Sequence, residues 1–243
     1  MGTLSTPFAP IVNATTGLKP VRKLLDKALK IDHRRELPKY SFGTFRRWYR
    51  QQAEQQQRYA EQVAFFHGCF VNYNHPQLGK DLIKVFNAMD IGVQLLKREK
   101  CCGVPLIANG FIAQAKKQAK VNAESLHEAV LTKGIPVVAT SSSCTFTLRD
   151  EYPHLLDVDT SAVRERVELA TRYLYRLISQ GRTLPLKQTP LRVAYHTPCH
   201  MEKNGLDSLY AGAIAADPRA GTGGAGLAVL RYRRNLRLQV GKL

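Results

Sequence analysis

An α/β fold built around a parallel sheet is the architecture that this sequence predicts. From about residue 61 onward, short apolar runs alternate with longer segments of helical periodicity, which is the pattern of repeated strand–helix units. The chain is also long enough to bury a substantial core, with 243 residues of which 44% are hydrophobic and 23% charged. Because helical crossovers between consecutive strands are right-handed and return the chain to the same edge, the strands are expected to run parallel.

The elements are expected in a regular order along the chain. Apolar runs predict the strands, and amphipathic periodicity predicts the helices between them. Residues 181–190 contain two prolines and are typical of a linker. The predicted strands are 63–69, 91–96, 135–140 and 191–197, and the predicted helices are 77–90, 112–132 and 161–179.

Before this alternation, residues 1–60 are predicted to form a basic helical segment. Between Lys19 and Lys30, apolar residues recur at helical spacing while the basic residues lie mostly elsewhere on the helical wheel. Such a helix can lie on an anionic membrane surface or dock on a partner subunit. It can equally be an ordinary domain-packing helix with a solvated charged face.

The formal net charge of +17, which clusters at the two ends of the chain, does not by itself predict nucleic-acid binding. No recognised binding motif accompanies the charge. Phe42, Phe45, Trp48 and Tyr49 lie among arginines and could stack on bases, but we expect them to form the apolar side of a short helix. Nucleic acid is therefore not an expected partner.

The cysteine count and the N-terminal residues indicate a reducing compartment. Five cysteines are too few for a disulfide-rich secreted scaffold, and their odd number leaves one unpaired. The first residues lack the basic start and apolar core of a signal peptide, and no run of about 18 apolar residues could span a bilayer. The chain is expected to be cytoplasmic or peripheral to a membrane.

The cysteines occupy related positions in the predicted fold. Cys69, Cys144 and Cys199 each follow a predicted strand, and the pair Cys101-Cys102 follows a fourth strand after a short turn. Ligands of open parallel sheets bind at the carboxyl edge, so these loops can bring residues far apart in sequence to one site. Thiolates are soft ligands that suit iron–sulfur clusters and zinc.

Zinc, core packing and a redox disulfide are the alternatives to an iron–sulfur cluster. Structural zinc sites usually pair ligands two to four residues apart, whereas here one pair is adjacent and the others are isolated. Free cysteines also pack as small hydrophobic residues, although loops rich in Gly, Ser and Pro are an unusual place for a core. A disulfide between Cys101 and Cys102 would be strained. The pattern favours a cluster.

The residues around the cysteines also resemble a known family. FFHGCFVNYNHPQLGKDLIKV, KREKCCGVPLIANGF and VVATSSSCTF are similar to the cysteine-rich, or CCG, domain of electron-transfer subunits in anaerobic dehydrogenases and heterodisulfide reductases. The resemblance runs from about residue 4 to residue 203, including IDHRR, LPKYSFGTFRRWYR and YHTPCHMEK. Over that length it is to the family members of anaerobic glycerol-3-phosphate dehydrogenases.

That resemblance implies a function and a set of ligands. Such family members bind iron–sulfur clusters, here expected to be 4Fe-4S, and pass electrons from flavin-containing dehydrogenase subunits toward membrane quinone. They lie peripherally on the cytoplasmic side of the cytoplasmic membrane. By resemblance, Cys69, Cys101, Cys102 and Cys144 would be the metal ligands of a first CCG repeat, and Cys199 the first ligand of a second.

Two other functions remain open at this point. One is a CCG subunit of another oxidoreductase, acting on lactate, glycolate or a heterodisulfide. The other is a non-redox basic binding protein in which the cysteines are incidental. We find no pattern typical of a catalytic triad, a nucleotide-binding loop or a carboxylate pair, so the chain is expected to be a non-catalytic subunit.

The sequence departs from the family pattern in three places. No cysteine precedes Cys69, where the family has a ferredoxin-like segment, so the chain is expected to start inside its parent protein. Ser141 replaces the first cysteine of a Cys-x-x-Cys that ends at Cys144, which leaves the fourth ligand to Cys102 or a neighbouring side chain. The resemblance stops near Asn204.

A second cysteine repeat begins but is not completed. VAYHTPC at 193–199 resembles VAFFHGC at 63–69, yet no adjacent cysteines follow about 30 residues later. Residues 228–232 can be encoded so that a shift of one nucleotide reads Gln-Cys-Cys-Gly, and we expect an out-of-frame, poorly ordered tail, the alternative being a genuine basic tail. The expected divisions are 1–60 basic helical segment, 61–180 first CCG domain, 191–204 start of a second repeat and 205–243 tail.

Overall fold

The structure is a computed structural model of the whole chain. It describes residues 8–184, 195–196, 198–203 and 229–230. The chain divides into two compact units, residues 1–170 and 171–243, and each unit is described by itself.

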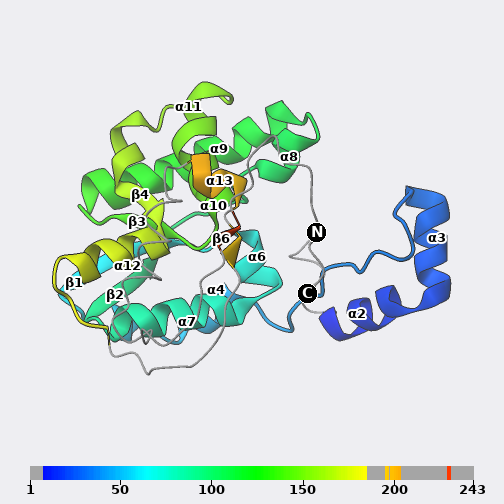
Figure 1. The fold of residues 1–243 in the computed structure, drawn as a ribbon, viewed down its shortest axis with the longest axis horizontal. Helices are drawn as coiled ribbons and strands as arrows, with labels where there is room; N and C mark the ends of the chain where they lie inside the picture. Colours follow the sequence, from blue (N-terminus) through cyan, green and yellow to red (C-terminus); the bar gives the residue numbers. More distant parts are fainter. Residues whose placement is uncertain (1–7, 185–194, 197, 204–228, 231–243) are drawn as a thin grey trace. The chain divides into compact units, whose positions relative to one another are not determined.

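The first unit contains a four-stranded parallel sheet with the strand order β2-β1-β3-β4 (Figure 1). Strand β1 pairs with β2 on one side and with β3 on the other, and β3 pairs with β4. All four strands are parallel, so their carboxyl ends share one edge of the sheet, which confirms the predicted α/β fold. The strands are β1 (Glu61–Phe66), β2 (Ile91–Leu95), β3 (Val137–Ala139) and β4 (Val167–Leu169).

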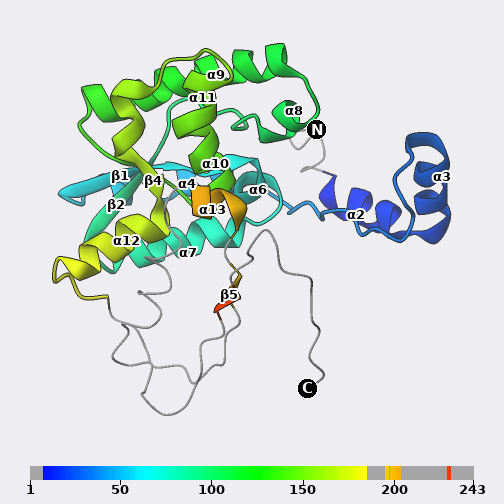
Figure 2. The same ribbon diagram turned by 45° about the horizontal axis from the view of Figure 1, so that its top comes forward.

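Both faces of the sheet are apolar and both are covered by helices (Figures 1 and 2). Ala64 of β1 belongs to an apolar cluster with the buried face of α9 (Ile112–His127). The next residue, Phe65, points to the opposite face and meets Phe45 of α4 (Phe45–Arg50), with their ring centroids 5.7 Å apart. A strand buried on both sides is typical of parallel sheets.

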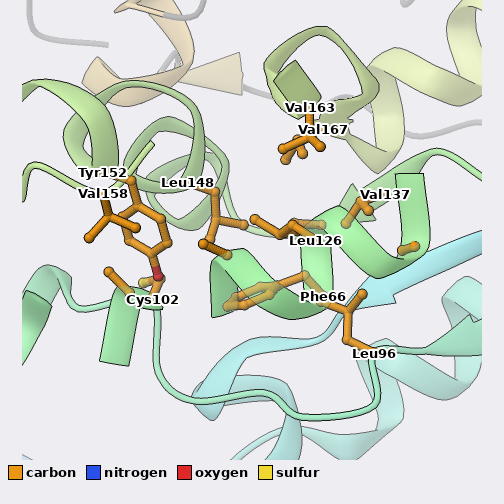
Figure 3. Packing of buried hydrophobic residues seen from close by; sticks show 14 of the residues in the cluster. Phe66, Leu96, Cys102, Leu126, Val137, Leu148, Tyr152, Val158, Val163 and Val167 are labelled. Carbon is orange, nitrogen blue, oxygen red and sulfur yellow. The ribbon is translucent and has the colours of Figure 1, made fainter. Parts of the chain in front are cut away.

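The cluster on the α9 face forms the core beneath the cysteine loops (Figure 3). Ala115 and Ala119 of α9 are fully buried, and side chains this small let the helix approach its neighbours closely. Cys102 is part of the same cluster and only 4% exposed. One of the predicted ligands therefore lies within the apolar core.

The helices predicted over 77–90 and 112–132 are present with shifted ends. The first begins one residue earlier and ends at Asn87, and the second ends at His127 and continues as a π-helical turn. The remaining elements of this unit are α2 (Ala9–Gly17), α3 (Lys19–Leu29), α5 (Ala53–Gln56), α6 (Gly68–Tyr73), α7 (Pro76–Asn87), α8 (Val104–Ala108), η1 (Glu128–Thr132), α10 (Ser142–Phe146), η2 (Thr147–Glu151), α11 (Tyr152–His154) and η3 (Ser161–Arg166).

The helix predicted over 161–179 is wrong in its first half. Residues 161–166 form a 3-10 helix, and 167–169 form strand β4. Only α12 (Ala170–Ser179) is α-helical. The apolar residues of this stretch suit helical spacing, but Val167 pairs with Val137 of β3, and that contact decides the conformation. A strand of three residues is too short to be recognised by its own periodicity.

The N-terminal segment contains the predicted basic helix. No residue of α3 is buried, and Leu24 and Leu29 are 66% and 63% exposed. The segment that follows is tied back to α2, because Asn13 donates to the backbone oxygen of Tyr40 at 2.7 Å and accepts from its N–H at 2.9 Å. The amphipathic character of α3 is thus present on a helix that buries none of its apolar residues.

The aromatic residues of α4 pack mainly inward. Phe45 is fully buried and Tyr49 is 8% exposed, with the Tyr49 hydroxyl donating to the backbone oxygen of Val93 at 2.7 Å. Phe42, which precedes the helix, is 77% exposed. Phe45 and Tyr49 therefore form the apolar side of a short helix, as predicted, and not a platform for stacking bases.

Fewer residues of the second unit are described. Strand β5 (Tyr195–His196) pairs in parallel with β6 (Val229–Leu230), and α13 (Cys199–Lys203) follows β5. The strand predicted over 191–197 is thus described only at 195–196. Apart from 229–230, the predicted tail at 205–243 lies outside the described residues, and its reading frame stays a prediction. Within the described ranges, no helix has the length and apolarity to cross a membrane.

Candidate metal centre

Three cysteine-bearing loops follow three parallel strands at one edge of the sheet. Cys69 lies in the first turn of α6 after β1, Cys101 and Cys102 lie between β2 and α8, and Cys144 lies in α10 after β3. In the order β2-β1-β3-β4, the connections from β1 and β3 leave in opposite directions. The carboxyl ends of these two strands therefore flank a switch point, the place where open α/β sheets bind ligands.

Two glycines shape the loops beside the cysteines. Gly68 and Gly103 have φ angles of +70° and +108°, which residues with a side chain rarely adopt. A Cβ built on Gly68 would lie 3.6 Å from the Sγ of Cys144, so the loop after β1 passes directly against the loop after β3. The glycine of the Cys-Cys-Gly motif thus has a conformational reason to be glycine.

The four thiols form a row of neighbours from the core to the surface. The Sγ atoms of Cys69 and Cys101 are 3.8 Å apart, far longer than the bond of about 2.05 Å in a disulfide. Cys101 in turn contacts Cys102, and Cys102 contacts Cys144. Cys102 is buried, Cys101 and Cys144 are half-buried, and Cys69 is exposed.

The sulfurs are too widely spread for a compact zinc site. Four thiolates around zinc, with bonds of about 2.3 Å, would all lie about 3.8 Å from one another. No three of these sulfurs lie within 4.8 Å of one another. In the described part of the chain, the one trio of potential ligands that meets this limit is Asp26, Asp32 and His33, outside the cysteine site. A row of soft donors that is not compact fits a multi-iron cluster better than a single ion.

Hydrogen bonds among the thiols polarise them in alternation. Donation from Cys102, and then from Cys69, lowers the pKa of Cys101. Donation from Cys102 also lowers the pKa of Cys144. The same bonds raise the pKa values of Cys69 and Cys102, because these two act as donors. Two thiolates, the form that binds metals, are therefore favoured within the row.

A buried carboxyl group joins the first cysteine loop to the second. The side chain of Glu99, only 1% exposed, accepts hydrogen bonds from the N–H groups of His67 and Gly68 at 3.3 and 2.7 Å. Its Oε1 also lies 3.1 Å from Nδ1 of His67. Since Glu99 stands two residues before Cys101 and Gly68 one before Cys69, this group fixes the spacing of two predicted ligands.

The same network includes Arg46 from α4. Its Nε donates to Nε2 of His67 at 3.3 Å, and a terminal nitrogen donates to the backbone oxygen of Leu96 at 2.7 Å. A guanidinium can only donate, so Nε2 of His67 is an acceptor and the ring proton is on Nδ1. Burial accordingly lowers the pKa of His67 to about 4, and burial raises the pKa of Glu99 to about 8.

An amide on α9 joins the second cysteine loop to the third. Asn122, fully buried, accepts from the N–H of Lys100 at 2.8 Å and donates to the backbone oxygen of Cys101 at 3.3 Å. It also donates to the hydroxyl of Tyr152 at 2.8 Å. Tyr152 ends the π-helical turn η2, which continues directly from the helix of Cys144.

Ser141 and Cys199 have positions different from those of the four thiols. The hydroxyl of Ser141 accepts from the N–H of Cys144 at 3.3 Å and caps α10. Cys199 is exposed in α13 of the second unit, and the four thiols that the structure brings together belong to the first. The sequence identified these cysteines but missed Arg46, Glu99, Asn122 and Tyr152, none of which follows a motif.

Comparisons with known proteins give the site a context. Residues 63–149 match the family of cysteine-rich domains named CCG. The chain is 73% identical to a component of the anaerobic glycerol-3-phosphate dehydrogenase of Escherichia coli K12, the one designated C, over 205 residues, which are 84% of this chain and 52% of the relative. The chain thus spans about half the length of that relative.

More distant relatives share the cysteine region. Lactate utilization protein A of Bacillus velezensis is 29% identical over 150 residues, 58% of either chain. An uncharacterized iron–sulfur protein of Methanocaldococcus jannaschii is 29% identical over 141 residues, 58% of this chain and 26% of the relative. No solved structure matches the chain.

Proposed function

Because residues 63–149 of this chain belong to the CCG family of cysteine-rich domains, we propose that the chain is an iron–sulfur electron-transfer subunit. The observation that carries the proposal is the convergence of Cys69, Cys101, Cys102 and Cys144 at the switch point of a parallel sheet. Relatives named as iron–sulfur proteins support the same cofactor.

The four thiols would hold one cluster, which we propose to be of the 4Fe-4S type. A bound cluster supplies a one-electron carrier. The chain supplies the thiolates, keeps them spaced through Glu99 and Asn122, and shields the inner side with the apolar core around Cys102. Because Cys69 is exposed, one side of the site lies near the surface, where an electron can be exchanged with another protein.

The natural electron donor would be a dehydrogenase that oxidises glycerol 3-phosphate. The 73% identity to a component of such an enzyme favours this substrate over lactate, for which the relative is 29% identical. We propose that flavin-containing subunits deliver the electrons and that the acceptor is quinone in the membrane. The complex would lie peripherally on the cytoplasmic side of the cytoplasmic membrane.

Helix α3 is the proposed membrane contact. Its apolar residues Leu24 and Leu29 are exposed, and basic residues cover much of the remaining surface of the helix. An amphipathic helix of this kind can insert its apolar side into the headgroup region while its lysines attract anionic lipids.

Metal analysis of the full chain, purified without oxygen, tests the cofactor. We expect iron and acid-labile sulfide in similar amounts, at most one weakly held cluster per chain, and an electron paramagnetic resonance (EPR) signal after reduction. Zinc without sulfide would contradict the proposal. An iron-free protein that binds nucleic acid with a steep salt dependence would also contradict it.

Reduction of the cluster by different dehydrogenases tests the donor. The flavin subunits of a glycerol-3-phosphate dehydrogenase, given their substrate, should bleach the visible absorbance of the reconstituted chain. A lactate-oxidising partner should bleach it more slowly. If lactate gave the faster reduction, the chain would belong with the lactate-utilising relatives.

Sedimentation with lipid vesicles tests the membrane contact. The chain should bind vesicles that contain phosphatidylserine or phosphatidylglycerol, and the double variant L24E/L29E should remain in the supernatant. A matched double variant at exposed polar positions of α7, Q77E/K84E, changes charge more strongly without altering the apolar face of α3. Equal loss of binding in both variants would mean that net charge, and not α3, drives the association.

A further inference from the structure

The hydroxyl group of Tyr152 has a proton that no oxygen or nitrogen of the described residues accepts. Tyr152 is fully buried, and its hydroxyl has one hydrogen-bond partner among those residues, the amide nitrogen of Asn122 at 2.8 Å. In that bond the hydroxyl oxygen is the acceptor. A buried donor without an acceptor is unfavourable by about 1–3 kcal/mol, so the missing acceptor calls for an explanation.

The other contacts of Asn122 fix the direction of this bond. Its Oδ1 accepts from the N–H of Lys100, and a backbone N–H can only donate. The Nδ2 group therefore faces the backbone oxygen of Cys101 and the hydroxyl of Tyr152, and it donates to both. Because the oxygen of Tyr152 is used as an acceptor, its own O–H is left to point elsewhere.

The cysteine row lies where this O–H can point. Figure 3 shows the hydroxyl end of Tyr152 directed toward Cys102, and both residues belong to the same buried cluster. The thiols of Cys102, Cys144 and Cys101 are also close enough to disfavour a negative charge on the phenol. Burial raises the pKa of Tyr152 above its usual range, so the group keeps its proton as a donor.

We infer that the hydroxyl of Tyr152, oriented by Asn122, donates a hydrogen bond to a sulfur of the cysteine centre and so raises the reduction potential of a cluster bound there. The inference rests on the proposed function. Reduction adds negative charge to a cluster, and a donor at one of its sulfurs stabilises the more negative state. Tyr152 acts through a ligand or a cluster sulfur and is not itself an expected metal ligand.

Packing alone does not account for the pair. The hold of Asn122 on the second cysteine loop uses Lys100 and Cys101 and does not need Tyr152. A phenylalanine at 152 would fill the same space without burying a hydroxyl, whose burial is costly unless its proton is used. A donor role toward sulfur supplies that use.

The variant Tyr152→Phe removes the hydroxyl and keeps the ring. In the full chain reconstituted with iron and sulfide, we expect unchanged iron content and a more negative midpoint potential in an EPR-monitored redox titration. A variant with the wild-type potential would overturn the inference while leaving the proposed function intact. A wild-type chain that takes up no iron would instead count against the proposed function.

Tyr49→Phe is the matched control. Tyr49 is also buried, but its hydroxyl donates to the backbone oxygen of Val93 in strand β2. Its loss should lower the stability of the chain by an amount comparable to that of Tyr152→Phe and leave the potential unchanged. Equal shifts of potential in the two variants would show a general effect of destabilisation and overturn the inference.

Cobalt provides a measurement that needs no cluster. Co²⁺ bound to thiolates in the cluster-free chain has sulfur-to-metal charge-transfer bands, whose energy rises when a sulfur accepts a hydrogen bond. We expect these bands at lower energy in Tyr152→Phe than in the wild type, with Tyr49→Phe unchanged. Identical bands in all three proteins would overturn the inference, and a wild-type chain that binds neither iron nor cobalt would overturn both proposals.

Discussion

The cysteine edge of the sheet and the helix α3 hold their functional groups in opposite environments. At the edge, Glu99, Asn122 and Tyr152 are almost entirely buried and bonded to one another's loops. In α3, no residue is buried, and the exposed leucines have no apolar neighbours that cover them among the described residues. The edge therefore has its geometry fixed internally, whereas α3 has an apolar face that a separate partner must cover.

This contrast separates two kinds of substitution. Changes at the edge should alter metal binding and stability together, because the same contacts hold the ligands and the core. Changes on the exposed face of α3 should alter association with a membrane and little else.

The largest effect is expected from removing the buried ligand. Cys102→Ser should abolish iron binding, because it replaces a soft thiolate at the position that links Cys101 to Cys144. Iron and sulfide analysis after anaerobic reconstitution measures the loss. Cys199→Ser is the control and should keep the iron of the first site. Unchanged iron in Cys102→Ser would refute the ligand assignment.

A large loss of stability is expected when the amide that joins two cysteine loops is removed. Asn122→Ala leaves the N–H of Lys100 and the hydroxyl of Tyr152 without their buried partner, which should cost about 2–4 kcal/mol of unfolding free energy. Urea unfolding of the metal-free chain measures it. Asn109→Ala removes an exposed amide that donates to Pro105 at 2.7 Å and should cost under about 1 kcal/mol. Equal losses in both variants would mean that Asn122 does not hold the loops.

Glu99 should make the stability of the metal-free chain depend on pH. Its pKa in the folded chain is about 8, against an ordinary value of 4.5, so the folded state retains a proton that the unfolded state has released. Stability should then fall as pH rises from 4.5 to 8, by up to about 1.4 kcal/mol per pH unit. Burial of His67 acts in the opposite direction, with stability lost as pH falls from about 6.5 to about 4.

The variant Glu99→Gln isolates this contribution. Between about pH 6.5 and about pH 8, where His67 contributes little, wild-type unfolding free energy should decline relative to that of the variant. Urea unfolding at several pH values in this window gives the two slopes. Parallel slopes would show that Glu99 is already ionised in the folded chain, stabilised by the two N–H groups and by Arg46.

The smallest effect on the folded state is expected at α3. The variant L24E/L29E should change the unfolding free energy by no more than about 0.5 kcal/mol and leave iron content unchanged, because neither side chain is buried. Urea unfolding and metal analysis measure both quantities. A loss of about 2 kcal/mol or more, typical of a buried apolar side chain, would mean that α3 packs within the chain and is not free to meet a membrane.

Local pattern was sufficient for several features of this protein. The parallel α/β fold, the basic amphipathic helix and the convergence of the cysteine loops all follow from periodicity and from the order of strands and helices. The convergence could be predicted before the strand order was known, because parallel strands end at the same edge whatever their order. The replacement of part of a predicted helix by β4 could not, because Val167 suits both conformations until it pairs with β3.

By itself, then, the sequence determined the fold class, the candidate ligands and the exposed basic helix, since each depends on residues close together in the chain. Tertiary structure alone decided which strands are neighbours and which side chains hold the ligand loops. Asn122 meets Tyr152 across 30 residues, and Arg46 meets Leu96 across 50. Contacts at such separations leave no periodic signal in the sequence, because they exist only after the sheet has brought the loops together.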